Sequence, residues 1–338
     1  MQFEYTDPQT ELEKAFGGHY CINAFGKVEP GDDAKFGKFL ASSEPPPRTT
    51  VYIDSIGGDV DAAIGIGRAI RAGWFHTNIG KCLLKHGSSS DFIVEREFLP
   101  GRCLSAATLI YLGGRLRYFQ TGSEFGVHQF SFRDPSPDHI GQSQMLSAKI
   151  ARYVVEMGIS PDFLEISSSV RSAAIKFIEE HDLKQLEVVT GGQTDVSWSV
   201  QARGRMLYVR GERDSLYGHH KVMLSFVKSS GFIFWAVIEA QGREDELTGF
   251  PVVEIVIDDE DRRIDISDRS QRVIEGLYVN VLARLTQEEA REIAYSNSFG
   301  VQIRLSKDAP IFFGVSAMST ESGKEQLETF YSVLCEEA

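Results

Sequence analysis

The sequence has few of the features that mark an exported, membrane-spanning or metal-binding chain. Its 338 residues include only four cysteines, none of them in a CxxC pair, and the histidines form no HExxH motif or Cys/His cluster. We therefore expect no metal and no cofactor. No run approaches the roughly 20 apolar residues that cross a bilayer, and no basic-then-apolar leader opens the chain. These absences predict a cytoplasmic protein with no membrane span.

Positive charge is also scarce. Lysine and arginine number 35 against 48 aspartates and glutamates, which gives a net charge of −13. Because a phosphate backbone attracts proteins mainly through lysine and arginine, we expect no nucleic-acid partner. With 42% hydrophobic and 25% charged residues, the composition is that of a globular protein. The length indicates about two domains of roughly 100–200 residues each.

The placement of the cysteines leaves two interpretations open. Cys82 and Cys103 bracket the segment LLKHGSSSDFIVEREFLPGR, residues 83–102. A disulfide that closes this loop is reasonable in an oxidising compartment. Two reduced, partly buried thiols are the alternative, which the missing leader favours. The segment itself is either a cover over a functional site or a passive surface loop.

Residues 1–192 alternate between strand-like and helix-like segments, which predicts an α/β domain with a parallel-type sheet and right-handed crossovers. The helix expected at 59–72 carries apolar residues on one face and stops at Gly73. The expected strands are 20–25, 49–54, 76–79 and 126–130, and the other expected helices are 33–40, 106–112 and 140–157.

Residues 193–338 have a different pattern. After Gly191-Gly192 come closely spaced runs rich in Val, Ile, Phe and Tyr, such as KVMLSFV, FIFWAVI and VVEIVI, separated by turn residues. Such runs predict an antiparallel sandwich or barrel. Helices are expected at 287–295 and, ending the chain, at 321–335. This β-rich domain carries no catalytic motif, so we expect it to serve recognition or assembly.

Three segments of the first domain combine into a pattern typical of nucleophilic catalysis: DSIGGDV (54–60), GRCLSAATLIYLGG (101–114) and EFGVHQF (124–130). Each alone has a simple structural explanation: a tight turn, a serine that caps a helix, and a structural histidine. A serine becomes a useful nucleophile when a histidine takes its proton and two backbone N–H groups face the developing oxyanion. Ser105 and His128 fit the first two roles, and the third is met by Ala106 together with the glycine pair Gly57-Gly58.

The three segments resemble the ClpP-like serine proteases of the ClpP/crotonase fold over roughly residues 20–190. DSIGGDV resembles the SPGG-type oxyanion turn, with Ile56 in place of proline, and SAATLIYLGG resembles the nucleophile helix. GVHQF resembles the histidine strand. The likeness is greatest to bacterial ClpP-related proteins that are often predicted to be periplasmic. If a leader has been removed from this sequence, the periplasm is therefore the alternative compartment.

The resemblance implies a domain of ββα spiral units followed by the β domain, and a serine peptidase acting on a peptide or protein. Ser105 would be the nucleophile and His128 the base, with Gly58 and Ala106 forming the oxyanion hole. The chain is shorter than ClpP in the element that locks ClpP rings together. We therefore expect a small homo-oligomer, by default a dimer, and not a double ring.

The sequence departs from the family at the third catalytic residue. Where an acid is expected, the stretch SSSVRSAAIKFIEEHDL (167–183) has Ala173, Ala174 and Ile175. Asp162 and Glu165 are the candidate acidic partners. Losing the orienting carboxylate can cost about four orders of magnitude in turnover. The pair is then a weak dyad, a dyad completed by a backbone carbonyl or a neighbouring acid, or an inactive remnant.

Three functions follow. The leading hypothesis is a ClpP-like serine hydrolase, specifically a peptidase. The first alternative is a catalytically inactive ClpP-like scaffold whose β domain binds a partner, which the missing acid motivates. The second is a crotonase-type acyl-CoA enzyme, which uses a two-donor oxyanion hole but needs no Ser/His pair. The presence of both Ser105 and His128 counts against this last alternative.

Overall fold

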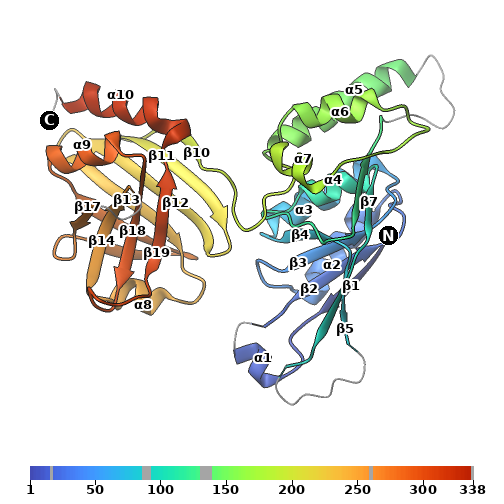
Figure 1. The fold of residues 1–338 in the computed structure, drawn as a ribbon, viewed down its shortest axis with the longest axis horizontal. Coiled ribbons are helices and arrows are strands. Elements are labelled where there is room, and N and C mark those ends of the chain that lie inside the picture. Colours follow the sequence, from blue (N-terminus) through green and yellow to red (C-terminus); the bar gives the residue numbers. More distant parts are fainter. Residues whose placement is uncertain (16–17, 86–92, 130–138, 259–261, 336–338) are drawn as a thin grey trace. The chain divides into compact units, whose positions relative to one another are not determined.

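The chain folds into two compact units, Met1–Gly192 and Gln193–Ala338 (Figure 1). The computed structural model describes residues 1–15, 18–85, 93–129, 139–258 and 262–335.

A four-stranded sheet lies at the centre of unit 1, in the order β1-β2-β3-β4. The strands β2, β3 and β4 are parallel to one another, and β1 pairs with β2 in the antiparallel direction at one edge. A helix follows β2 and another follows β3, as parallel crossovers require. The bounds are β1 Gln2–Thr6, β2 Cys21–Phe25, α2 Asp32–Ser43, β3 Thr50–Asp54, α3 Val60–Ala72 and β4 His76–Ile79.

A second, smaller sheet continues from the end of β3. β7 (Arg102–Leu104) is parallel to β8 (Glu124–Val127), which pairs with β9 (Lys176–Phe177). A parallel bridge between Ser55 and Cys103 joins the two sheets. A separate hairpin consists of β5 (Lys81–Leu84) and β6 (Arg96–Leu99). The remaining helices of unit 1 are α1 Glu11–Ala15, α4 Ala107–Leu112, α5 His139–Glu156, α6 Asp162–Ser169 and α7 Glu180–Gln185.

The helix α4 is held tightly against α3 in the core of unit 1. All six residues of α4 are buried. A Cβ atom on Gly113 would lie 2.2 Å from the Gly67 carbonyl oxygen, so only glycine permits this approach of the two backbones. The Tyr153 hydroxyl donates to the Leu109 carbonyl across 2.7 Å and ties α5 to the same helix. The position of α4 therefore depends on backbone contact as well as on apolar packing.

Unit 2 consists of two antiparallel sheets that share one hydrophobic core. Phe234 and Ile255, from different sheets, belong to this core, and the helices α9 and α10 add Ile293 and Leu327. Figure 1 shows α9 and α10 side by side on unit 2. The larger sheet contains β10 Ser197–Arg203, β11 Met206–Ser215, β12 Gly218–Val227, β13 Gly231–Glu239, β17 Tyr278–Arg284 and β16 Gln271–Glu275. The smaller sheet contains β15 Arg262–Asp265, β14 Val252–Ile257, β18 Ser298–Arg304 and β19 Phe313–Ser319, and the helices are α8 Glu244–Gly249, α9 Gln287–Tyr295, η1 Glu321–Gly323 and α10 Lys324–Cys335.

Several elements differ from the expectations drawn from the sequence. The strand expected at 126–130 begins earlier, as β8, and ends at Val127, while Phe130 lies outside the described residues. The single helix expected at 321–335 is the short 3₁₀ turn η1 followed by α10. The strand β1 and the hairpin β5–β6 were not expected. Both are short or edge elements, for which the apolar alternation in the sequence is weak.

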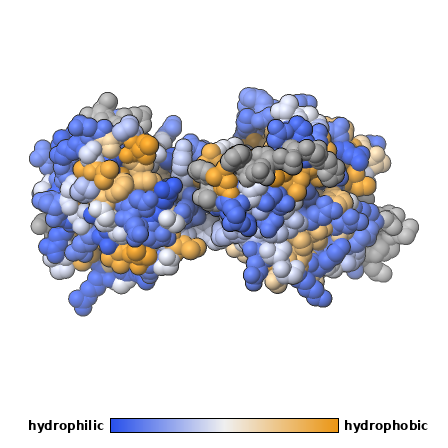
Figure 2. Space-filling model, turned by 90° about the horizontal axis from the view of Figure 1, so that it is seen from below, coloured by the Kyte–Doolittle hydropathy of each residue, from blue (hydrophilic) through white to orange (hydrophobic). Residues whose placement is uncertain are grey.

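The surface of the described residues carries scattered hydrophobic side chains. On the face shown in Figure 2, hydrophobic residues gather in small patches among hydrophilic ones on each unit. Exposed examples include Tyr217 and Ile311 in unit 2. Within the described ranges, no helix is both long and apolar enough to span a membrane.

A buried carboxylate ties the smaller sheet of unit 2 together. Glu254, on β14, accepts hydrogen bonds from Arg304 on β18 and, across 3.0 Å, from Arg263 on β15. Glu254 and Arg304 are both buried. Removing one partner of a buried ion pair leaves the other charge in a low-dielectric environment without compensation. The three strands therefore depend on this carboxylate.

We predict that Glu254→Ala lowers the free energy of unfolding by about 3–5 kcal/mol. The measurement is urea denaturation of the full chain, followed by tryptophan fluorescence. The matched control is Glu292→Ala, which removes an ion pair with the exposed Arg262 and should cost at most about 1 kcal/mol. Equal, small losses in both variants would contradict this assignment.

Candidate active site

The turn after β3 brings the backbone of Gly57 and Gly58 against two other segments. The Val28 N–H donates to the Gly57 carbonyl, and the Asp59 N–H donates to the Val28 carbonyl. Gly58 has a φ of 145°, and a Cβ atom there would lie 2.0 Å from the Val28 oxygen. A Cβ atom on Gly57 would lie 2.8 Å from the Ser105 Cβ. Only glycines allow this turn, and it places them beside Ser105.

Ser105 lies at the junction between β7 and α4 in a strained backbone conformation. Its φ is 56°, in the left-handed region that non-glycine residues rarely adopt. Two contacts hold it there: the Ser105 N–H donates to the Gly126 carbonyl across 2.8 Å, and the Ser105 carbonyl accepts from the backbone and side chain of Thr108. Strain of this kind persists where the surroundings over-determine the residue, and it is common at reactive sites. A sharp strand-to-helix turn also exposes the serine side chain of the α/β-hydrolases.

The N–H groups of Gly58 and Ala106 are both without an acceptor among the described residues. Gly58 forms a parallel bridge with Val28, in which Val28 bonds to the Gly57 carbonyl and to the Asp59 N–H. The N–H of Gly58 itself takes no part in these bonds. The Gly58 N–H then points away from Val28. Ala106 is the N-cap of α4, where backbone N–H groups have no partner within the helix. The two donors expected from the sequence are therefore available to a ligand.

His128 follows β8, two residues beyond the Gly126 carbonyl that holds Ser105. Its ring is half-buried, and Nδ1 lies 2.8 Å from the carbonyl oxygen of Gln129. A carbonyl oxygen only accepts, so Nδ1 is the nitrogen that carries the proton. The lone pair of the neutral ring is then on Nε2. No hydrogen bond joins the Ser105 and His128 side chains in the described structure.

Ser105, His128 and Gly58 line one cavity of about 760 Å³. Part of its wall is apolar, formed by Val60, Leu146, Ile150 and Leu164, and the remainder includes several serines and two aspartates, Ser143, Ser147, Ser167, Ser168, Asp59 and Asp61. None of the described residues of the 83–102 segment contributes to the lining. The cavity thus brings together three of the expected site residues, which lie on separate segments of the chain, with Ala106 next to Ser105.

The two candidate acids are not among the lining residues. Asp162 and Glu165 are exposed on α6, while Leu164 and Ser167 of the same helix face the cavity. Among the described residues, no ion pair joins a carboxylate to His128. The partner of its Nδ1 is the Gln129 carbonyl, one of the alternatives that the sequence left open. Every residue has a backbone carbonyl, so the sequence alone does not show which one accepts from the histidine.

The four cysteines of the chain are free thiols. Cys103 is fully buried next to Ser55, and burial raises the pKa of its thiol. Cys82 lies instead against Cys21 and His19, and the potential ligand atoms of these three residues are all within 4.8 Å of one another. The sequence shows no Cys/His cluster because Cys21 and Cys82 are 61 residues apart, but the fold brings the two cysteines together with His19. The H-x-C spacing of His19 and Cys21 was the one available signal.

Unit 2 has a cavity of its own, of about 690 Å³. Its wall combines cationic and aromatic side chains, among them Arg213, Arg243, Tyr217 and Phe313. Burial lowers the pKa of the Arg213 guanidinium. The lining also includes Ser215, Ser316, His220 and the carboxylate of Glu239.

Comparison with known proteins gives similarities among solved structures only. No family model matches the chain, and no curated protein matches it. The structure resembles that of a point mutant of ClpP1 from Listeria monocytogenes, with 17% sequence identity and a TM-score of 0.36. The match covers 50% of this chain and 88% of that chain. At this level of similarity it carries no information about activity, substrate or assembly.

We predict that Gly58→Ala disrupts the turn beside Ser105. The new methyl group would meet the Val28 carbonyl in a conformation that alanine rarely adopts, so we expect the free energy of unfolding to fall by at least about 1–3 kcal/mol. Chemical denaturation measures the loss. Gly141→Ala is the matched control, since a Cβ atom there meets nothing within 4 Å and the residue is in the helix α5. A Gly58→Ala protein as stable as this control would contradict the described turn.

Proposed function

We propose that the protein is a ClpP-like serine hydrolase that cleaves peptides, with Ser105 as its nucleophile and His128 as its base. The observation that carries the proposal is the convergence, on one cavity, of a serine in a strained turn and a histidine with its Nε2 lone pair available. Two unpaired backbone N–H groups lie beside that serine. The resemblance of the three sequence segments to the ClpP-like proteases supports the same chemistry. It also supports an arrangement of unit 1 in ββα units.

In the proposed reaction, the Ser105 Oγ attacks the substrate carbonyl carbon while its proton passes to His128 Nε2. The N–H groups of Gly58 and Ala106 stabilise the oxyanion that forms. His128 then gives the proton to the leaving amine as the carbon–nitrogen bond breaks. Water, deprotonated by the same nitrogen, then attacks the acyl carbon, and the bond to Ser105 Oγ breaks as His128 returns the proton to that oxygen. The Gln129 carbonyl keeps the proton of the neutral ring on Nδ1, so that Nε2 can act as the base.

The lack of a Ser105–His128 hydrogen bond among the described residues is compatible with this role, because catalytic hydrogen bonds are often loose until a substrate binds. A carbonyl oxygen is neutral, however, and stabilises an imidazolium less than a carboxylate does. Since loss of the orienting carboxylate costs about four orders of magnitude in turnover, we expect slow hydrolysis. The apolar wall formed by Val60, Leu146 and Leu164 favours substrates with an apolar side chain next to the scissile bond.

The test is covalent labelling of the full chain by a fluorophosphonate, followed by intact-protein and peptide mass spectrometry. We predict one adduct, on Ser105, which Ser105→Ala abolishes. His128→Gln should slow labelling by about 10²–10⁴-fold, the usual contribution of a positioned base.

Ser168→Ala is the matched control for this experiment. Ser168 lines the same cavity and is exposed, but no histidine contact is described for it, so its variant should label like the wild type. Labelling that persists in Ser105→Ala would contradict the proposal. An unlabelled wild-type protein would also contradict it, and tight binding of a CoA thioester would then favour the crotonase-type alternative.

The second candidate is a scaffold without hydrolase activity, in which unit 2 binds a partner. Two observations favour it: among the described residues no ion pair joins a carboxylate to His128, and unit 2 has a cavity whose lining includes cationic and aromatic side chains. It is distinguished from the hydrolase by the same labelling experiment. In either case we propose a small homo-oligomer.

A further inference from the structure

A second cluster of reactive side chains lies in unit 1, on the hairpin side of the central sheet. Cys21 begins β2, Cys82 is on β5, and His19 precedes β2 by two residues. Both cysteines are buried, whereas the histidine is exposed on one side. Neither the nucleophile nor the base of the proposed hydrolase belongs to this cluster. We propose that His19, Cys21 and Cys82 bind a soft divalent metal ion, with Zn²⁺ as the natural occupant.

The separations match those of a tetrahedral zinc site. With zinc–sulfur bonds of ~2.3 Å and zinc–nitrogen bonds of ~2.0–2.1 Å, a thiolate and an imidazole on one ion lie about 3.6 Å apart. The Cys82 Sγ is 3.7 Å from His19 Nε2, and all three ligand atoms fall within 4.8 Å of one another. Two sulfurs and one imidazole nitrogen bind zinc better than they bind harder cations such as Mg²⁺ or Ca²⁺. Only small side-chain shifts are needed to close the site.

The surrounding contacts hold the ligands in place before any metal binds. The Asn23 side chain bonds the backbone of Cys82 at two points, accepting from its N–H across 2.9 Å and donating to its carbonyl across 2.8 Å. This fixes β5 beside β2. The Phe98 ring lies edge-on to the His19 ring at 5.9 Å and shields one side of the cluster. Such outer contacts set the orientation of metal ligands in zinc proteins.

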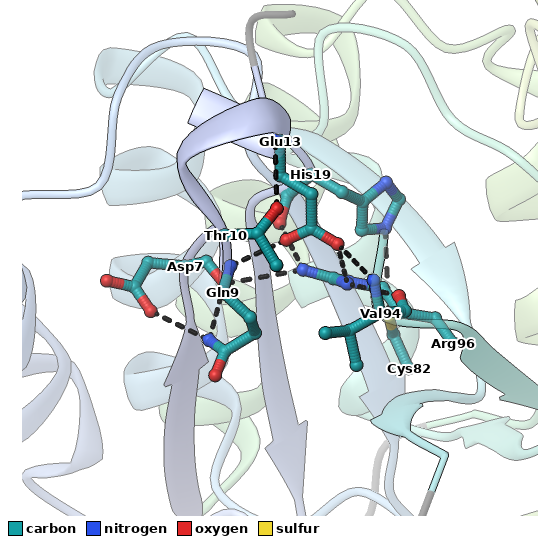
Figure 3. A network of polar contacts seen from close by, with 8 residues as sticks. All are labelled: Asp7, Gln9, Thr10, Glu13, His19, Cys82, Val94 and Arg96. Atoms are coloured by element: carbon teal, nitrogen blue, oxygen red, sulfur yellow. Dashed lines mark hydrogen bonds and ion pairs between the residues drawn. The ribbon is translucent and has the colours of Figure 1, made fainter. Parts of the chain in front are cut away.

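Arg96 and Glu13 fix the segment that carries His19 (Figure 3). The Arg96 guanidinium donates to the His19 carbonyl across 3.0 Å and contacts a Glu13 carboxylate oxygen at 3.5 Å. Glu13 also accepts from the backbone N–H groups of Gln9 and Val94, so both of its oxygens are occupied. Glu13 is therefore a positioning residue and not a ligand. The fourth metal position is left to water or to a bound molecule.

Solvent reaches the cluster through its histidine. A cavity of about 370 Å³ is lined by His19 together with Arg96, Phe98 and neighbouring residues of the hairpin. On binding, the metal replaces the two thiol protons, which are released to water, so one Zn²⁺ and two thiolates form a neutral centre. The ion would join β2, the hairpin β5–β6 and the segment before β2. We therefore expect binding to stabilise unit 1.

The experiment uses the full chain, reduced and freed of metal by a chelator, and titrated anaerobically with Co²⁺ and then with Zn²⁺. We expect one Co²⁺ per chain with a thiolate-to-cobalt charge-transfer band, displaced by one Zn²⁺. Zn²⁺ should also raise the melting temperature and protect Cys21 and Cys82 from alkylation. Cys21→Ser and Cys82→Ser should lose the band, and Cys103→Ser, which removes a buried thiol elsewhere in unit 1, should keep it.

His19→Gln keeps the proposal testable if a buried cysteine variant fails to fold, because His19 is exposed. Its Zn²⁺ affinity should fall by at least about tenfold, since loss of outer contacts alone costs 10–100-fold in other zinc sites, and its circular dichroism should match the wild type. The proposal is overturned if the reduced protein binds no Co²⁺ or Zn²⁺, or if His19→Gln binds Zn²⁺ as tightly as the wild type. It is equally overturned if Cys21 and Cys82 form a disulfide that excludes metal under the titration conditions. Ser105 labelling is independent of every one of these outcomes.

Discussion

The candidate active site depends on backbone segments that approach more closely than side chains allow. Gly57 and Gly58 lie against Val28 on one side and Ser105 on the other, at distances where a Cβ atom would clash. The same condition applies to Gly67 and Gly113, which let α3 and α4 touch. Because α4 follows Ser105 closely in the chain, both contacts fix the position of Ser105. Four residues without side chains therefore determine where the proposed nucleophile lies.

Strain at Ser105 fits this arrangement. The residue has a left-handed backbone conformation, which its Cβ atom disfavours, and hydrogen bonds to Gly126 and Thr108 hold it there. The strand β8 supplies both the Gly126 carbonyl and, after Val127, the histidine. A single strand thus sets the position of the serine backbone and of the proposed base. Precision at the site comes from the sheet rather than from direct contact between the two side chains.

The sequence was sufficient for elements with a strong local signature. The helix expected at 287–295 agrees with α9, whose start is marked by a capping box between Thr286 and Glu289. The strand at 76–79 agrees with β4. The sequence did not predict contacts that depend on the fold. Nothing in the spacing places Cys21 beside Cys82, and nothing assigns the Gln129 carbonyl to His128. These depend on tertiary packing and on backbone atoms that every residue possesses.

The N–H groups of Gly58 and Ala106, which have no acceptor among the described residues, belong to the backbone, so no change of the Ser105 or His128 side chain removes them. A chain that lost its serine or histidine would still present a receptor for a carbonyl oxygen or a carboxylate within the same cavity. Recognition and bond cleavage are thus separable in this fold. The proposed hydrolase can therefore become a binding protein by one substitution, without rebuilding the surface that holds its ligand.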